Sequence, residues 1–133
     1  MKNRWGLLVL VVITAIFYLT FQTPSETMAL SNGFRAWLAE RFGIELNSHA
    51  ARSGAHIPLY FALGLSLCLW AGWKNALRLG PLIGLTDELI KILLPTRHFD
   101  LEDLIIDIVS VAAGAFAVVM FRRIRDRLLK RSP

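Results

Sequence analysis

Four long apolar segments constrain this sequence more than any other feature. They are separated by more polar or charged stretches and lack the alternating or 3.6-residue pattern of a half-buried soluble element. Segments of roughly 17–25 apolar residues are long enough to cross the hydrocarbon core of a bilayer as helices. The predicted spans are residues 5–21, 56–73, 77–94 and 104–121. We therefore expect a single-domain, all-α integral membrane protein with four transmembrane helices.

The first segment has two interpretations, because a charged start followed by an apolar stretch is typical of an anchor and of a signal peptide. Lys2 and Arg4 precede it, and Gln22 follows it. No small-x-small cleavage site follows promptly after Phe21, which favours an uncleaved transmembrane anchor.

The third segment is the weakest span by hydropathy, since it contains Asp87, Glu88 and Lys91. Ionisable residues inside a membrane are energetically costly and seldom face lipid. We nevertheless expect this segment to span, because only then do its charges share one depth with polar residues of the neighbouring segments.

Basic residues are distributed unequally between the two sides of the predicted bundle. Ten lie on the side of the termini and second loop: Lys2, Arg4, Lys74, Arg78, Arg122, Arg123, Arg125, Arg127, Lys130 and Arg131. Four lie on the other side: Arg35, Arg41, Arg52 and Arg97. Because basic loops stay in the cytoplasm, this bias predicts that both termini are cytoplasmic.

The basic tail, residues 122–133, is expected to be cytoplasmic. Such a tail acts as a topology anchor or contacts anionic lipid headgroups. No recognition motif accompanies its charge, so we expect no nucleic-acid partner.

The first outer loop is long and contains a second type of helix. Apolar residues recur at helical spacing over residues 30–42, and Gly43 is a natural helix stop. This pattern predicts a short amphipathic helix, which lies either on the outer membrane surface or over the mouth of the bundle as a lid.

Polar residues of three predicted spans converge at one depth. Glu88 lies about 9 Å below the outer end of its span and Asp107 about 6 Å inside the next, at about 1.5 Å per residue. His56 and Tyr60 lie in the first turns of the second span. This convergence predicts a site near the outer end of the bundle.

Three motifs within roughly residues 50–118 resemble the VanZ-like family. They are His56-x-x-x-Tyr60-x-x-Leu63-Gly64, Gly84-x-x-Asp87-Glu88-x-x-Lys91-x-x-x-Pro95-Thr96-Arg97 and Asp103-x-x-x-Asp107-x-x-Ser110-x-x-x-Gly114. They are similar to the family patterns H-x-x-x-Y-x-x-L-G, G-x-x-D-E-x-x-Q-x-x-x-P-G-R and D-x-x-x-N-x-x-G-x-x-x-G, in the same order.

The chain departs from these patterns in an informative way. Lys91 stands where the family has Gln, and Asp107 where it has Asn; Thr96 and Ser110 each replace a Gly. Two neutral amides have thus become a cation and an anion, which predicts a buried structural ion pair between Lys91 and Asp107.

The resemblance implies a multi-pass protein of the bacterial inner (cytoplasmic) membrane. The name-giving member of the family is linked to low-level resistance to the glycopeptide teicoplanin, and most of the family has no assigned biochemical activity. The resemblance therefore supports fold and location more than mechanism.

Three functions fit the residues. The first is recognition of an anionic lipid or a lipid-linked envelope precursor at the outer leaflet, with ligand-binding residues Arg97, His56, Tyr60, Glu88 and Asp103. The second is a lipid hydrolase or transferase with Glu88 or His56 as catalytic base and Arg97 stabilising negative charge, although no covalent nucleophile is evident. The third, ion or proton translocation, is disfavoured because the charges occupy one leaflet.

Several polar residues also have plain structural explanations. Asp100 is expected to cap the fourth span with Asp103 at its third position, Asp87 to pair with Arg97 or His98 at the surface, and Arg52 to be a loop charge. His49, His56 and His98 lack any compact ligand spacing, so we predict no metal and no cofactor. Cys68 is expected to be a small apolar filler.

Overall fold

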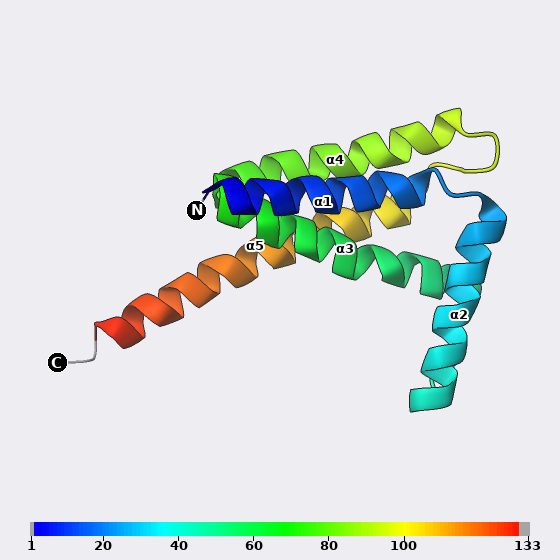
Figure 1. Cartoon of the computed structure of the whole chain (residues 1–133), viewed down its shortest axis with the longest axis horizontal. Helices are drawn as coiled ribbons and strands as arrows, with labels where there is room; N and C mark the ends of the chain where they lie inside the picture. Colours follow the sequence, from blue (N-terminus) through cyan, green and yellow to red (C-terminus); the bar gives the residue numbers. More distant parts are fainter. Residues whose placement is uncertain (1, 131–133) are drawn as a thin grey trace.

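The computed structural model describes residues 2–130, except the side chains of Lys2, Pro24, residues 48–50 and Arg52. The described chain is all-helical, and no strand occurs in it (Figure 1). Its helices are α1 (Lys2–Thr20), α2 (Pro24–Phe42), α3 (Ser48–Ala71), α4 (Trp73–Leu93) and α5 (Leu101–Leu129). The predicted fold class is therefore confirmed at the level of an all-α protein.

Helices α1, α3, α4 and α5 form a bundle. Its central helix is α3, which packs against α1, α4 and above all α5. The remaining helix, α2, runs across one end of this bundle (Figure 1). At the opposite end lie the start of α1, the α3–α4 connection at Gly72 and the C-terminal part of α5, which projects away from the bundle.

Glycines allow α3 and α5 to approach one another at backbone distance. A Cβ atom added at Gly64 of α3 would lie 2.1 Å from the carbonyl oxygen of Val111, and one added at Gly114 would lie 2.2 Å from that of Phe61. Small residues permit this close approach in membrane bundles, where helix association depends on packing.

Three helices have the length and composition of membrane spans. They lie at Asn3–Thr20, Ser53–Ala71 and Leu101–Leu129. The predicted third span, now α4, is not among them, because its charged residues lower its hydropathy.

The outer helix is longer than predicted. It begins at Pro24 rather than at residue 30, because Thr23 caps it and forms a reciprocal capping box with Glu26. The hydrogen bond from the Thr23 backbone N–H to Glu26, with a second from the Thr23 hydroxyl, lowers the pKa of Glu26 below its usual value. Its end is as expected, since Gly43 adopts a left-handed conformation with φ 65°.

The second span also starts earlier than predicted. The predicted start at residue 56 is wrong, because α3 begins at Ser48, and Pro58 lies inside the helix. Proline cannot donate the backbone hydrogen bond of a helix interior, so α3 loses one such bond at this point.

The last helix begins and ends in polar sequence. Asp100 is its N-cap, as predicted, and accepts a hydrogen bond from the Glu102 N–H at 2.9 Å. The helix continues to Leu129, so the described part of the basic tail is helical and exposed.

The close α3–α5 contact predicts that Gly64→Ala and Gly114→Ala destabilise the bundle by about 1–3 kcal/mol or more, since each new methyl group meets backbone. Gly54→Ala is the matched control in α3, because its Cβ would meet no described atom within 4 Å. Unfolding in mixed SDS micelles, followed by tryptophan fluorescence, measures the difference. Equal stabilities for Gly64→Ala and Gly54→Ala would contradict the close packing.

Candidate functional site

A cavity of about 830 Å³ lies at the end of the bundle that α2 crosses. All five helices and the α4–α5 loop contribute to its wall. The apolar part of the wall consists of Ile16, Leu19, Met28, Leu30, Phe34 and Leu59, among others. Its polar part includes His56, Tyr60, Asp87, Lys91, Arg97 and Asp103. The cavity thus offers an apolar surface and a charged surface to the same occupant.

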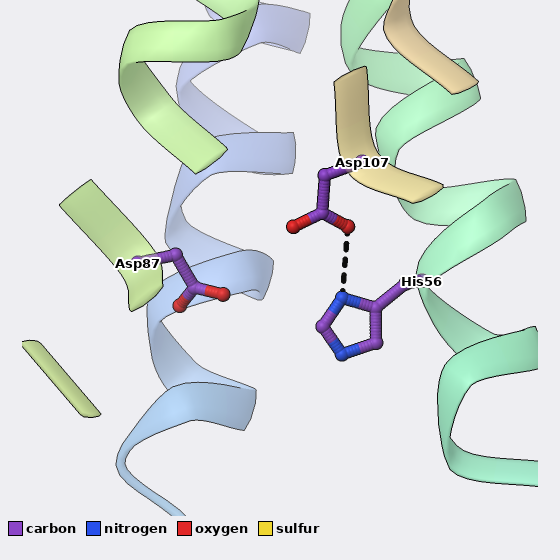
Figure 2. A group of neighbouring side chains, drawn as sticks. All are labelled: His56, Asp87 and Asp107. Atoms are coloured by element: carbon purple, nitrogen blue, oxygen red, sulfur yellow. Dashed lines mark hydrogen bonds and ion pairs between the residues drawn. The ribbon is translucent and has the colours of Figure 1, made fainter. Parts of the chain in front are cut away.

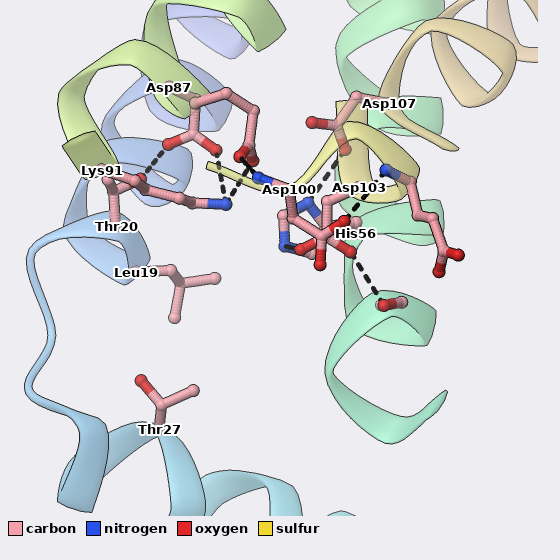
Figure 3. A network of polar contacts seen from close by, with 12 residues as sticks. Leu19, Thr20, Thr27, His56, Asp87, Lys91, Asp100, Asp103 and Asp107 are labelled. Atoms are coloured by element: carbon pink, nitrogen blue, oxygen red, sulfur yellow. Dashed lines mark hydrogen bonds and ion pairs between the residues drawn. The ribbon is translucent and has the colours of Figure 1, made fainter. Parts of the chain in front are cut away.

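His56 lies between two carboxylates of α5. Its Nδ1 atom is 2.9 Å from Asp107 Oδ1, and its Nε2 atom is 3.9 Å from Asp103 Oδ2 (Figures 2 and 3). Ser53, one turn earlier on α3, donates a hydrogen bond of 2.8 Å to Asp103 Oδ1. The part of α3 before residue 56, which was expected to be loop, therefore supplies Ser53 to this side of the site. Residues i, i+3 and i+4 of a helix share a face, which aligns Ser53 and His56 with α5.

Asp87 is the residue whose position was predicted least well. It was expected to pair with Arg97 or His98 at the surface, but only 2% of it is exposed. Its carboxylate accepts hydrogen bonds from the Thr20 hydroxyl of α1 and, at 3.2 Å, from the Tyr60 hydroxyl of α3. Asp87 therefore joins α4 to two other helices inside the bundle.

The buried ion pairs differ from the predicted one. Lys91 contacts Glu88 and lies with its Nζ atom 3.6 Å from Asp87 Oδ2, both within α4 (Figure 3). Asp107, its expected partner, instead contacts His56 of α3. The reason is local: positions i−3 and i−4 lie on the same face of α4 as Lys91, so its ammonium reaches them without crossing to α5.

Both carboxylate oxygens of Glu88 bond to protein groups. One contacts Lys91, and the other accepts a 2.9 Å hydrogen bond from the backbone N–H of Asp100. Glu88 is fully buried and is not among the residues that line the cavity. It thereby fixes the start of α5 relative to α4.

Arg97 ties the α4–α5 loop to the junction of α1 and α2. Its Nη2 atom donates to the carbonyl oxygens of Gln22 at 2.9 Å and Leu19 at 3.3 Å, and to the Thr27 hydroxyl at 2.6 Å. The guanidinium thus lines the cavity, and its hydrogen bonds connect the segments that surround the cavity at this point.

Residues 5–122 match the family described as VanZ/LLP1. The chain belongs to the VanZ/LLP1 family. This confirms the family assignment made from the three motifs, and it supports a membrane protein. Searches of curated proteins and of solved structures gave no match to the chain.

Within this VanZ/LLP1 member, the structure brings His56, Tyr60, Arg97 and Asp103 to one cavity, as the sequence suggested, while Glu88 lies behind its wall. The side chains of His49 and Arg52 lie outside the described residues. Cys68 packs in the apolar core.

Sequence reasoning missed two hydroxyl groups, those of Thr20 and Ser53. Each is buried and hydrogen-bonded to an aspartate of another helix. The available signal was their place as isolated polar residues near the ends of apolar helices, where a membrane protein must satisfy them internally.

The arrangement has two chemical capacities. His56 with Asp107 is an imidazole oriented by a carboxylate, the pairing used for general bases. His56, Asp87 and Asp107 also place one metal-ligating atom each within 4.8 Å of one another. No local spacing in the sequence reveals this group, because each member comes from a different helix.

A double-mutant cycle distinguishes the observed pairing from the predicted one. Lys91→Gln alone should destabilise the fold by about 3–5 kcal/mol, because it leaves buried carboxylates uncompensated. Combining it with Glu88→Gln should show a coupling of about 0.5–3 kcal/mol in the free energy of unfolding. Combining it with Asp107→Asn should show a smaller coupling, and a larger one there would favour a direct pair across the helices.

Proposed function

We propose that this VanZ/LLP1 member crosses the membrane four times and binds an anionic amphiphile from the outer leaflet in the cavity beneath α2. The observation that carries the proposal is the cavity itself, which joins apolar walls to buried charged groups. The proposed function has three parts: α4 inserts into the membrane, the cavity end of the bundle faces outward, and the ligand is an anionic amphiphile.

The surface of α4 supports its insertion. The helix has 21 residues, about 31 Å at 1.5 Å per residue, which matches the thickness of a bilayer core. Its charged residues Asp87, Glu88 and Lys91 are buried against the other helices. The exposed side chains are largely apolar: Leu82, Leu85, Leu89, Ile92 and Leu93. A helix with this distribution can face lipid despite its low overall hydropathy.

The distribution of basic residues supports a cytoplasmic location for both termini. The start of α1, the α3–α4 connection and the C-terminal part of α5 lie at the end opposite α2 (Figure 1), and these segments contain Arg4, Lys74 and most of the basic tail. Loops rich in Lys and Arg remain in the cytoplasm, so the cavity end would face outward. This orientation gives α2 a place across the outer end of the bundle.

Cysteine labelling tests whether α4 crosses the membrane. In a Cys68→Ala background, a membrane-impermeant maleimide should label Thr96→Cys on intact cells and Asn75→Cys only after permeabilisation. Both positions are exposed and lie at opposite ends of α4. Labelling of both positions on intact cells, or of neither, would contradict a fourth span.

The chemistry of the cavity supports an amphiphilic ligand. Its volume of about 830 Å³ is in the range of roughly 300–1,000 Å³ typical of small-molecule sites. Lys91 and Arg97 would meet a phosphate, and Leu19, Leu59 and Phe34 would contact a hydrocarbon chain. A phospholipid or a lipid-linked envelope precursor has both parts. Such binding would connect the chain to envelope protection of the kind that the family resemblance suggests, including resistance to teicoplanin-type glycopeptides.

The bond between His56 and Asp107 favours a second candidate, a lipid hydrolase or transferase. Here His56, oriented by Asp107, would take a proton from water or a substrate hydroxyl. Glu88 is less suited to this role, because both of its oxygens bond to protein groups. Translocation stays the weakest candidate, since the charges gather at one end of the bundle.

Filling the cavity without removing a polar bond tests ligand binding. Ala55→Trp should lower the occupancy of copurified lipid by about tenfold, equal to about 1.4 kcal/mol, because Ala55 lines the cavity. Ala113→Trp is the control on an exposed face of α5, outside the cavity lining. Native mass spectrometry measures the occupancy, and thermal unfolding checks that both variants fold. Equal occupancy in the two variants would contradict this binding site.

A further inference from the structure

Three side chains from three helices meet beside the cavity, which two of them, His56 and Asp87, line. His56 comes from α3, Asp87 from α4 and Asp107 from α5, and Figure 2 shows all three directed toward a common space. We propose that they form a binding site for one divalent transition-metal ion. The proposal does not depend on which amphiphile the cavity takes.

The spacing of the donor atoms fits a metal. One ligating atom of each residue lies within 4.8 Å of the other two, and the closest pair, His56 Nδ1 and Asp107 Oδ1, is 2.9 Å apart. Nitrogen and carboxylate ligands bind ions such as Zn²⁺ at about 2.0–2.2 Å, which places two ligands of one ion about 3–4 Å apart. Small side-chain rotations would bring the three atoms onto one ion.

A buried, unpartnered oxygen points to a ligand. Asp107 is 1% exposed, and its Oδ2 atom has no hydrogen-bond partner among the described residues. Figure 2 shows the oxygen that is not bonded to His56 on the side that faces Asp87. Buried polar atoms in native proteins are almost always satisfied, so an orphaned carboxylate oxygen calls for a donor or a cation.

The local charge balance also calls for a cation. The described buried residues include four carboxylates, those of Asp87, Glu88, Asp103 and Asp107, but only one lysine, Lys91. Buried carboxylates therefore outnumber buried ammonium groups in this part of the described chain. Unpaired charges inside a membrane bundle are strongly unfavourable. A divalent ion would offset part of this excess at the point where the carboxylates are closest.

The donor set indicates the class of ion. One imidazole and two carboxylates suit Mn²⁺, Fe²⁺ or Zn²⁺ better than a soft ion that prefers thiolates. The Lys91 ammonium, 3.6 Å from Asp87 Oδ2, would compete with the ion for that oxygen. Because His56 and Asp87 line the cavity, an ion could enter through it.

The test uses the full chain purified without a histidine tag, stripped with a chelator and titrated with Mn²⁺ in detergent. We expect one Mn²⁺ per chain, displaced by Zn²⁺, with a ¹⁴N coupling in pulsed EPR that reports a histidine ligand. His49→Gln combined with His98→Gln should retain this coupling, and His56→Gln should abolish it. Asp107→Asn should weaken Mn²⁺ binding at least about tenfold, whereas Asp126→Asn, an exposed carboxylate of α5, should leave it unchanged.

Two results would overturn the site. One is that the unmodified chain binds neither ion at about 1 mM, the concentration equal to a binding free energy of about −4 kcal/mol. The other is that the ¹⁴N coupling persists in His56→Gln or disappears when only His49 and His98 are replaced. Because the unmodified chain supplies the stoichiometry and the coupling, the proposal stays testable even where a variant fails to fold.

Discussion

Burial of charge inside an apolar bundle is the constraint on which the rest of this structure depends. Asp87, Glu88, Asp103 and Asp107 are at most 2% exposed, although the helices that carry them have largely apolar outer surfaces. Carboxylates in such surroundings must bond to protein groups or to a ligand. Apart from the contacts of Lys91 within α4, bonds that satisfy them join two elements: Thr20 to Asp87, Ser53 to Asp103, His56 to Asp107 and Glu88 to the N–H of Asp100. The polar cluster therefore determines how α1, α3, α4 and α5 meet.

The same constraint connects architecture to function. Among the described bundle helices, α4 alone is not a membrane-span candidate by composition, and its charged residues Asp87, Glu88 and Lys91 are buried. The network that hides these charges also forms the polar wall of the cavity, while Arg97 holds α2 and the α4–α5 loop around its rim. Stability and the proposed ligand binding would thus depend on overlapping residues in this VanZ/LLP1 member. A substitution in the cluster will change both, so variants that fill the cavity from its apolar side are the more informative probes of binding.

The sequence predicted the helices, their order and the end of the bundle that carries the polar residues. Depth follows from counting along a helix, so His56, Asp103 and Asp107 could be grouped in advance. The bonding partners of these residues could not be predicted, because they depend on how each helix is rotated. Adjacent Asp87 and Glu88 both contact Lys91, but their other partners lie on different elements. Lys91 bonds within α4 instead of reaching Asp107. The early start of α3 could not be predicted either, because the sequence around Ser53 is typical of a loop and its hydrogen bond to Asp103 is known only from the structure. The start of α2 was predictable, because Thr23 and Glu26 have the spacing of a capping box.

The polar contact between α3 and α5 joins the bundle, and one distance tests it most directly. Solid-state NMR of the full chain in lipid bilayers can measure the separation between the His56 ring nitrogen and the Asp107 carboxyl carbon. The hydrogen bond of 2.9 Å between Nδ1 and Oδ1 predicts a nitrogen–carbon distance of about 4 Å or less. Absence of this short distance, in protein whose helices are formed, would show that the buried cluster is not what joins the bundle.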